Sequence, residues 1–170
     1  MGTINSTRLD GELLYQIISQ RPDYSFVFTG PEDDIFRRNR IHSLKNAYFT
    51  GQKKVDELPA YIAAYDVCIN PQMVNEITDG NYPLKIDEYL AMGKPTVATS
   101  THTMRNIFAG HTHLAINPEE WLAAIDRAVT EADDKELAKQ RIAFAETHSW
   151  GHSVKKIYEI IDSFLKKKTT

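Results

Sequence analysis

Glu88 is the residue whose type and position best suit the recognition of a ligand. It shares a helical i, i+4, i+7 stripe with Leu84 and Ala91, so the pattern predicts a carboxylate on an otherwise apolar face. Burying such a group without a partner costs on the order of several kcal/mol. Its partner is either structural, namely Lys85 one turn earlier or a backbone amide, or a ligand with hydroxyl donors, such as a ribose diol. The pattern leaves both interpretations open.

The sequence lacks the motifs of several common nucleotide-binding, hydrolytic and metal-binding sites. The chain contains no Gly-x-x-x-x-Gly-Lys-Ser/Thr phosphate loop, no Gly-x-Gly-x-x-Gly, no Gly-x-Ser-x-Gly and no Asp-x-Asp. Two histidine pairs, His111 with His113 and His148 with His152, lack the cysteine or carboxylate neighbours that are typical of a zinc site. We therefore expect no metal site and no cofactor.

The helix that carries Glu88 has recognisable ends. Asn81 is suited to cap it and Pro83 to begin it, while Gly93 fits the left-handed position at its end, with Pro95 close behind. A β-prone run follows at 96–99. The stretch from 78 to 100 therefore predicts a loop, a short helix, a turn and a strand.

The same alternation runs through the chain. Short β-prone runs occur at 24–29, 46–50, 67–70, 96–99 and 114–116, and helical patterns occur at 9–20, 55–65, 119–131, 134–147 and 150–165. This order predicts an α/β fold with a parallel sheet covered by helices on both faces. Ligands of such sheets bind beyond the carboxyl ends of the strands. Because the sequence contains no internal repeat and no low-complexity linker, we expect residues 1–170 to form a single domain.

Composition excludes several classes of partner and location. The net charge of −3 and the pI near 6.1 give no reason to expect nucleic acid. Cys68 is the sole cysteine and lies in an apolar run, which indicates a reducing compartment and an inert core thiol. No apolar run approaches the ~18 residues of a membrane span, and no secretion signal opens the chain. A cytoplasmic protein is therefore expected, although residues 1–6 loosely fit a myristoylation pattern.

Residues 83–99 resemble the nucleotide-sugar segment of two-domain GT-B glycosyltransferases of the group 1, family 4-like kind. The runs 26–31, 46–51 and 58–67 resemble, in order, further segments of the C-terminal half of these enzymes. The resemblance covers most of the chain. It implies a Rossmann-like domain that binds the nucleotide diphosphate sugar donor of a metal-independent hexosyltransferase, with cell-surface polysaccharide or glycolipid synthesis as the setting.

The resemblance also implies roles for particular residues. Glu88 matches the second glutamate of the family's Glu-x7-Glu motif, which accepts hydrogen bonds from the ribose. Arg8 has the spacing of the family's phosphate-binding cation, and these two residues are the expected catalytic groups. The other donor-binding residues expected are Gly51, Gln52 and Val55 beside the base, and Gly80, Asn81, Tyr82, Pro83 and Lys85 around the diphosphate, where the helix dipole contributes.

Two departures from the family pattern keep other interpretations open. Gly80 stands where the first glutamate of the motif is expected, and the N-terminal acceptor domain is absent, with residues 2–5 as at most a stub of the central strand. The chain then looks like an isolated donor half that is inactive alone and touches a membrane only through the complete enzyme. The alternatives are a non-catalytic nucleotide-binding module, a sugar-nucleotide epimerase of the same fold, and a receiver-type regulatory domain. The sequence does not indicate which base and sugar the donor carries, what the acceptor is, or whether the reaction retains or inverts the configuration of the sugar.

Overall fold

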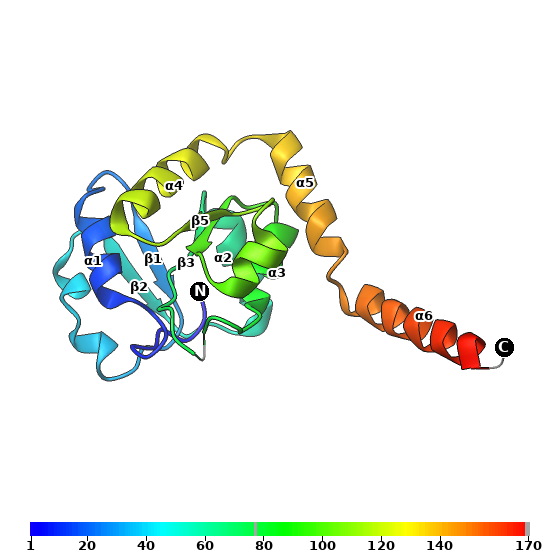
Figure 1. The fold of residues 1–170 in the computed structure, drawn as a ribbon. Helices are drawn as coiled ribbons and strands as arrows, with labels where there is room; N and C mark the ends of the chain where they lie inside the picture. Colours follow the sequence, from blue (N-terminus) through cyan, green and yellow to red (C-terminus); the bar gives the residue numbers. More distant parts are fainter. Residues whose placement is uncertain (77, 169–170) are drawn as a thin grey trace.

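Helices and parallel strands alternate along the chain (Figure 1). The computed structural model describes residues 1–76 and 78–168. The strands are β1 (Phe26–Thr29), β2 (Ala47–Gly51), β3 (Cys68–Asn70), β4 (Thr96–Thr99) and β5 (His113–Ala115). The helices are α1 (Gly11–Ser19), α2 (Leu58–Ala64), α3 (Leu84–Ala91), α4 (Pro118–Thr130), α5 (Lys135–Glu146) and α6 (Trp150–Lys168). Short 3-10 helices lie at Phe36–Arg38, Arg40–Ser43 and Val55–Glu57, and a π-helix lies at Met104–Phe108.

The strands form two separate parallel sheets. One has the order β1-β2 and the other β3-β4-β5. Ile69 pairs with Val97, and Val97 pairs with His113, so β4 is the central strand of the larger sheet. All five predicted strands are confirmed within two residues at either end, as are the parallel direction and the α/β fold.

Residues 2–4 lie where a strand between β1 and β3 belongs, but they reach only the end of β1. Gly2 N donates to Thr29 O at 2.8 Å and Ile4 N donates to Pro31 O at 2.9 Å. Ile4 forms an isolated parallel bridge with Glu32. The short central strand expected at residues 2–5 is therefore reduced to this edge contact.

The two faces of β4 bury two helical layers. Val97 belongs to a core that includes Leu14 and Ile17 of α1 and Trp121 of α4. Its neighbour Ala98 points to the other face, because side chains alternate along a strand, and packs in a second core with α3 and the π-helix. Cys68 lies in this second core, as predicted, and burial raises the pKa of its thiol to about 12.

Helix α3 buries a different stripe from the one that the sequence predicts. Ile86, Tyr89 and Leu90 are buried, whereas Leu84 is 64% exposed and Glu88 and Ala91 are exposed as well. The prediction that Glu88 interrupts a buried apolar face is wrong. In a helix of eight residues, two apolar positions are too few to set the phase, and the observed stripe through Ile86 and Tyr89 faces the second core.

The predicted N-cap of α3 is also wrong. Pro83 occupies the N-cap position, where no side chain caps the helix, and Asn81 is exposed in the preceding loop. At the other end the prediction holds, because Gly93 has φ +71°. Lys94 N then donates to Tyr89 O at 3.0 Å, which closes the helix end.

Gly93→Ala is expected to lower the free energy of unfolding by about 1–2 kcal/mol, because a residue with Cβ strains the left-handed conformation. The new Cβ lies 3.1 Å from Ala138 Cβ, so the contact between α3 and α5 tightens as well. Thermal unfolding measures the loss. Gly110→Ala, whose Cβ meets nothing within 4 Å, is the matched control, and equal melting temperatures for the two variants contradict the argument.

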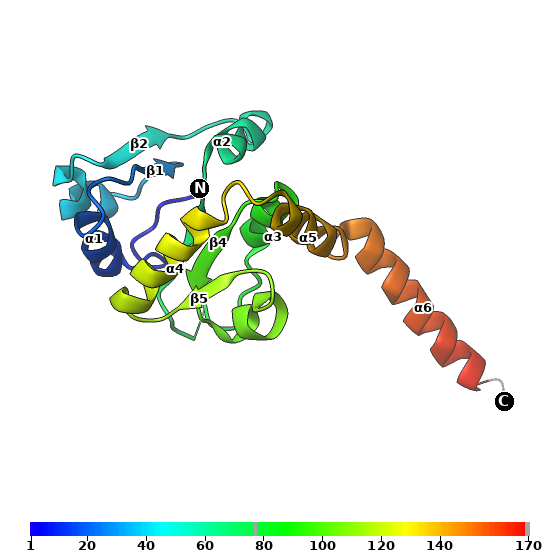
Figure 2. The ribbon, with the colours of Figure 1, turned by 90° about the horizontal axis from the view of Figure 1, so that it is seen from above.

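Helix α5 packs on α3, and α6 extends away from the sheets (Figures 1 and 2). At the link between α5 and α6, His148 Nδ1 lies 3.0 Å from Asp87 Oδ1 of α3. Helix α6 is amphipathic as predicted, but its apolar residues Val154, Ile157 and Ile161 are on the surface. None of the helices in the described ranges is long and apolar enough to cross a membrane.

Candidate functional site

A cavity of about 650 Å³ opens beside the N-terminus of α3. Its wall combines three segments that are distant in the sequence: residues 2–9, Gln72 after β3, and residues 81–85 at the start of α3. Because Gln72 follows the end of β3, the cavity lies at the carboxyl edge of the larger sheet, where ligands of parallel sheets bind. Of the predicted site residues, Arg8, Asn81, Tyr82, Pro83 and Lys85 all line this cavity.

The loop that carries Arg8 is held by its backbone. Arg8 O accepts a hydrogen bond from Met73 N at 2.8 Å, and Arg8 N donates to Asn5 O at 3.1 Å. Asp33 Oδ2 accepts from both the amide and the hydroxyl of Ser6 at 2.7 Å. Hydrogen bonds from the amides of Phe36 and Ser6 lower the pKa of Asp33, so the carboxylate that anchors this loop stays ionised.

The guanidinium of Arg8 is exposed and makes no hydrogen bond or ion pair with any residue that the structure describes. Its backbone is therefore fixed while its charge remains available to the cavity. An arginine in this state can give a planar, bidentate contact to a phosphate or carboxylate.

Lys85 places a second cation at the same cavity. A Cβ on Gly2 would lie 3.5 Å from Lys85 Nζ, so the ammonium group lies next to the N-terminal segment. Burial lowers the pKa of Lys85, and the nearby charge of Arg8 lowers it further, whereas Glu88 raises it. Two cations that repel each other in one cavity provide a favourable place for an anion.

The N-terminus of α3 adds to this positive field. Pro83 occupies the N-cap without a capping side chain, and Leu84 and Lys85 follow as the first helical residues on the cavity wall. The first amides of a helix have no partner within the helix, and its dipole favours negative charge at this end. The amides of this first turn therefore act together with Arg8 and Lys85.

The loop before α3 is held by side-chain hydrogen bonds. Tyr82 donates from its hydroxyl to Asp87 Oδ2 at 2.6 Å, and burial together with this bond raises the pKa of Tyr82. Asp79 Oδ1 accepts from His102 N at 2.7 Å. Thr78 N donates to Asn75 Oδ1 at 3.0 Å, which closes a turn. These contacts leave Asn81 exposed on the cavity wall.

Glu88 lies outside this wall but close to it. Its carboxylate is exposed, and with the described residues it makes neither a hydrogen bond nor an ion pair. Glu88 follows Lys85 by three residues and raises the pKa of Lys85. The two charges therefore interact electrostatically without a hydrogen bond or ion pair. This partnerless state fits the ligand interpretation of Glu88 better than the structural one.

The residues predicted to border the base lie at and after the carboxyl end of β2, in the smaller sheet. Gly51 ends β2 with φ +68°, and its carbonyl accepts from Gly30 N at 3.0 Å. Gln52 is exposed and Val55 is 83% exposed. Neither these three residues nor Gly80 lines the cavity.

The sequence prediction missed Gln72 and the small polar residues of the N-terminal loop. Gln72 is buried, and its carbonyl accepts from the Thr99 hydroxyl at 2.8 Å, which ties the ends of β3 and β4 together. Its position two residues after β3 was the available signal. Thr3, Asn5 and Thr7 also line the cavity, but their sequence pattern has no distinguishing feature.

The structure brings no metal-binding cluster together in the part of the chain that it describes: no three histidine, cysteine or acidic side chains there are positioned to share an ion. His113 instead lies 3.0 Å from Glu131 Oε1, and His148 contacts Asp87.

Comparison with known families identifies the fold and its family. The family described as "Glycosyl transferases group 1" matches residues 12–131. The chain belongs to this family. Lys85 and Glu88 lie within the matched range, whereas Arg8 precedes it, so the assignment of Arg8 rests on the cavity geometry and the spacing from Gly2.

One relative of this glycosyltransferase domain is a Bacillus subtilis (strain 168) protein, TuaH, named as a putative teichuronic acid biosynthesis glycosyltransferase. It is 28% identical over 149 residues, which are 84% of this chain and 37% of TuaH. The chain therefore spans little more than a third of the length of that relative.

Solved structures confirm the GT-B type of fold. Sucrose-phosphate synthase from Thermosynechococcus elongatus superposes with a TM-score of 0.71 at 16% identity, over 98% of this chain and 46% of that chain. WaaG, a glycosyltransferase involved in lipopolysaccharide biosynthesis, gives a TM-score of 0.63 at 14% identity, over 86% and 42%. At these identities the likeness concerns the fold alone.

Proposed function

We propose that this domain binds the nucleotide diphosphate sugar donor of a glycosyltransferase, with the diphosphate in the cavity beside α3. The observation that carries the proposal is the convergence of Arg8, Lys85 and the N-terminus of α3 on one cavity. The cavity is large enough for a diphosphate with part of its sugar, and it presents positive charge from three independent sources.

The proposed chemistry is electrostatic. As the glycosidic bond of the donor breaks, negative charge develops on the leaving diphosphate. Arg8, Lys85 and the first amides of α3 are placed to stabilise that charge, and such groups stabilise a transition state when they are oriented in advance. The sugar passes to an acceptor whose binding site lies outside this cavity.

The setting that we propose is polysaccharide biosynthesis in the cytoplasm. The family membership and the name of the relative TuaH, which refers to teichuronic acid biosynthesis, support polysaccharide biosynthesis, and the cytoplasmic location rests on the sequence alone. We propose that the side-chain cations of the cavity neutralise the diphosphate without a metal ion or cofactor, as the family resemblance implies.

A thermal-shift panel of UDP, GDP, ADP and CMP, each with its sugars, tests the proposal. We expect one base to be preferred, with Kd on the order of 0.1–1 mM. The affinity should fall from diphosphate to monophosphate to nucleoside and should weaken with salt, because the phosphates carry most of the recognition. Equal stabilisation by nucleoside and nucleoside diphosphate contradicts the assignment of the cavity.

Glu88→Gln separates recognition of the ribose from recognition of the phosphates. If the carboxylate accepts the ribose hydroxyls, nucleotide affinity falls by about 10–150-fold, the equivalent of ~1.5–3 kcal/mol for charge-assisted hydrogen bonds. Binding of inorganic pyrophosphate should be unchanged. Because Glu88 is exposed and has no described partner, the free energy of unfolding should stay within about 0.5 kcal/mol.

The matched control for that experiment is Glu146→Gln, an exposed glutamate at the end of α5. Isothermal titration with the preferred nucleotide and with pyrophosphate gives both affinities. A Glu88→Gln protein that binds the nucleotide as tightly as the Glu146→Gln control removes Glu88 from the proposed site.

A further inference from the structure

The loop that enters α3 is braced by a hydrogen bond across the first turn of the helix. Pro83 is the N-cap, so Tyr82 holds the position before it and Asp87 is the fourth residue of the helix. The Tyr82 hydroxyl donates to Asp87 Oδ2 at 2.6 Å. An apolar contact between these two positions fixes the angle at which a chain enters a helix. The hydrogen bond joins the same two positions, so we expect it to fix the entry angle of this loop.

The second carboxylate oxygen of Asp87 also has a partner. His148, between α5 and α6, places Nδ1 3.0 Å from Asp87 Oδ1. Two aromatic rings hold this imidazole edge-on, Phe144 at 4.5 Å and Phe108 at 5.8 Å between ring centres. The ring of Tyr82 lies 5.4 Å from Phe108 as well. Because both oxygens of Asp87 are bonded, its carboxylate has little freedom to turn, and Tyr82 meets an acceptor that is already oriented.

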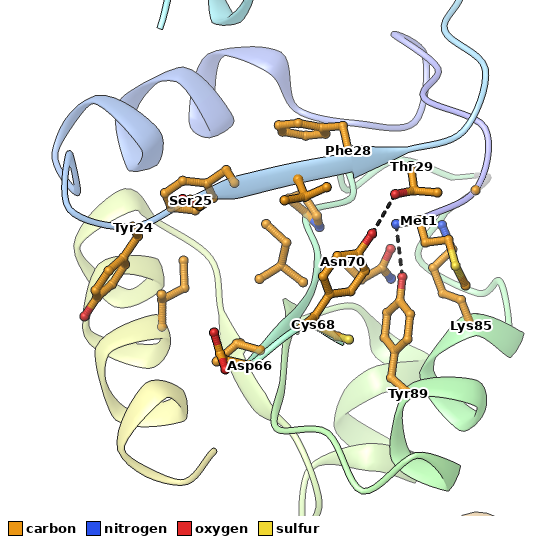
Figure 3. Close-up of a pocket in the computed structure, with 18 of the residues that line it drawn as sticks. Met1, Tyr24, Ser25, Phe28, Thr29, Asp66, Cys68, Asn70, Lys85 and Tyr89 are labelled. Atoms are coloured by element: carbon orange, nitrogen blue, oxygen red, sulfur yellow. Dashed lines mark hydrogen bonds between the residues drawn. The ribbon is translucent and has the colours of Figure 1, made fainter. Parts of the chain in front are cut away.

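Asp87 and the cation of Lys85 lie on different sides of α3. Lys85 and Tyr89, one turn apart, point toward the N-terminal segment, and Tyr89 Oη accepts from the Met1 amino group at 3.2 Å (Figure 3). Asp87 lies midway between these two helical residues in the sequence, which places it about 200° from each around the helix axis. It is also absent from the wall of the cavity of about 650 Å³. We therefore expect no contact between its carboxylate and an anion beside Lys85.

The entry angle of the loop decides where the first amides of α3 point. Leu84 and Lys85 supply these amides, both residues line the cavity, and no described side chain caps the helix. Amides in the first turn have no acceptor within the helix, so they are available to an anion. In the proposed site they act together with the side chains of Arg8 and Lys85. A shift of the loop therefore moves one of the three sources of positive charge relative to the other two.

The charge of Asp87 by itself opposes the binding of an anion. A carboxylate in the first turn interacts favourably with the positive end of the helix dipole, and there it competes with a bound phosphate. On charge alone, the removal of Asp87 should therefore strengthen anion binding. If its hydrogen bonds position the loop, removal should weaken anion binding instead. The two roles predict effects of opposite sign, so one measurement separates them.

We propose that Asp87 is a positioning residue for the diphosphate of the donor: through Tyr82 it sets the start of α3, and His148 orients its carboxylate. The inference rests on the proposed function and extends it to two residues, Asp87 and His148, that lie outside the cavity wall. The three side chains come from the loop before α3, from α3 itself and from the link between α5 and α6. The packing of these segments therefore contributes to the geometry of the anion site.

Asp87→Ala and Asp87→Asn form the first test. Both substitutions remove the charge, but only asparagine keeps an oxygen that can accept from Tyr82. Isothermal titration with inorganic pyrophosphate should give an affinity about three- to tenfold lower for Asp87→Ala, because part of the binding free energy then orders the loop. Asp87→Asn should bind at least as tightly as the unchanged protein. An Asp87→Ala protein that binds as tightly as Asp87→Asn overturns the proposal.

Tyr82→Phe tests the same hydrogen bond without a change of charge, and it keeps the ring beside Phe108. It should also weaken pyrophosphate binding by about three- to tenfold, so the proposal can be judged even where Asp87→Ala fails to fold. The two substitutions together should weaken binding no further than Asp87→Ala alone, because both remove one bond. Unchanged binding by Tyr82→Phe, or additive losses in the double variant, contradicts the positioning role.

His148→Ala and His111→Ala form a matched pair for the third side chain. Both imidazoles pack on Phe144, at 4.5 and 3.9 Å between ring centres, but among the described contacts only His148 bonds to Asp87. His148→Ala should weaken pyrophosphate binding by about two- to fivefold, and His111→Ala should leave it unchanged. In the Asp87→Ala background, His148→Ala should have no further effect. Equal effects of the two histidine variants, or the same loss with and without Asp87, remove His148 from the proposal.

The Arg8→Gln variant, titrated in parallel, separates this inference from the proposed function. If the unchanged protein binds no pyrophosphate, or if Arg8→Gln binds it as tightly, the proposed function fails and the positioning role fails with it. If Arg8→Gln weakens binding while Asp87→Ala and Tyr82→Phe do not, the positioning role fails alone. Loss of affinity in all three variants, with rescue by Asp87→Asn, supports both.

Discussion

Gly30→Ala is expected to destabilise the protein more than Gly93→Ala or any substitution in the cavity beside α3. Gly30 follows β1 with φ +144°, and a Cβ there would lie 1.9 Å from the carbonyl oxygen of Gly2. Backbone strain and overpacking each cost about 1–3 kcal/mol, so the free energy of unfolding should fall by about 2–6 kcal/mol. The melting temperature should then fall by about 5–20 °C.

The structure also predicts how the variant relieves this clash. The segment from Met1 to Ile4 has to leave the edge of β1, so the amides of Gly2 and Ile4 should lose their protection against hydrogen exchange. Gly80→Ala is the control, because its Cβ would meet nothing within 4 Å. A Gly30→Ala protein that melts with the control and keeps both amides protected contradicts the close approach of Gly2 and Gly30.

The strands and their parallel direction could be predicted from the sequence because each depends on a short, local residue pattern that repeats along the chain. Thr96–Thr99 matches β4 residue for residue, and Gly93 has the left-handed backbone that its position after a helix predicts. Each strand is bounded by a glycine, proline or asparagine, which restricts the error to two residues. Parallel strands follow from the alternation with helices.

The face of a short helix that becomes buried was harder to predict from the sequence. Helix α3 has eight residues, and its apolar positions allow a stripe through Leu84 as well as the observed stripe through Ile86, Tyr89 and Leu90. The choice depends on what packs around the helix, in this case α5 and the second core, to which Ile86, Tyr89 and Leu90 belong. Local periodicity does not contain that contact, which is why the surroundings of Glu88 were misjudged.

The separation of the sheet into two parts also depends on long-range contacts. Nothing in the run of residues 2–5 distinguishes a full strand from an edge contact, because the difference lies in how far the backbone extends along β1. Arg8, which the family resemblance implied as a phosphate-binding cation, lies on the wall of one cavity with Lys85, and its role there stays a prediction.

Removal of both cations is expected to abolish measurable binding of nucleoside diphosphates. Arg8→Gln alone should weaken binding by about 10–150-fold, the equivalent of ~1.5–3 kcal/mol for a charge-assisted contact to phosphate. Lys85→Met should weaken it to a similar degree. Because the two side chains act on one anion, the double variant should depart from the sum of the single effects.

The same variants should leave the fold intact, and this separates a binding role from a structural one. Arg8 has no side-chain partner among the described residues, and Lys85 is half-buried with a pKa lowered by burial and by Arg8. Replacing Lys85 by methionine removes that desolvation cost and the repulsion from Arg8, so the melting temperature of the unliganded protein should hold or rise.

Titration with the preferred nucleoside diphosphate and with inorganic pyrophosphate, at low and at high salt, measures the effect. Arg37→Gln and Lys45→Met, on residues outside the cavity wall, are the charge-matched controls. The salt dependence of binding should be retained in both controls and reduced in each single variant, because the ligand's phosphates then meet one side-chain cation fewer in the cavity. A double variant that melts normally and binds pyrophosphate like its controls places the diphosphate elsewhere.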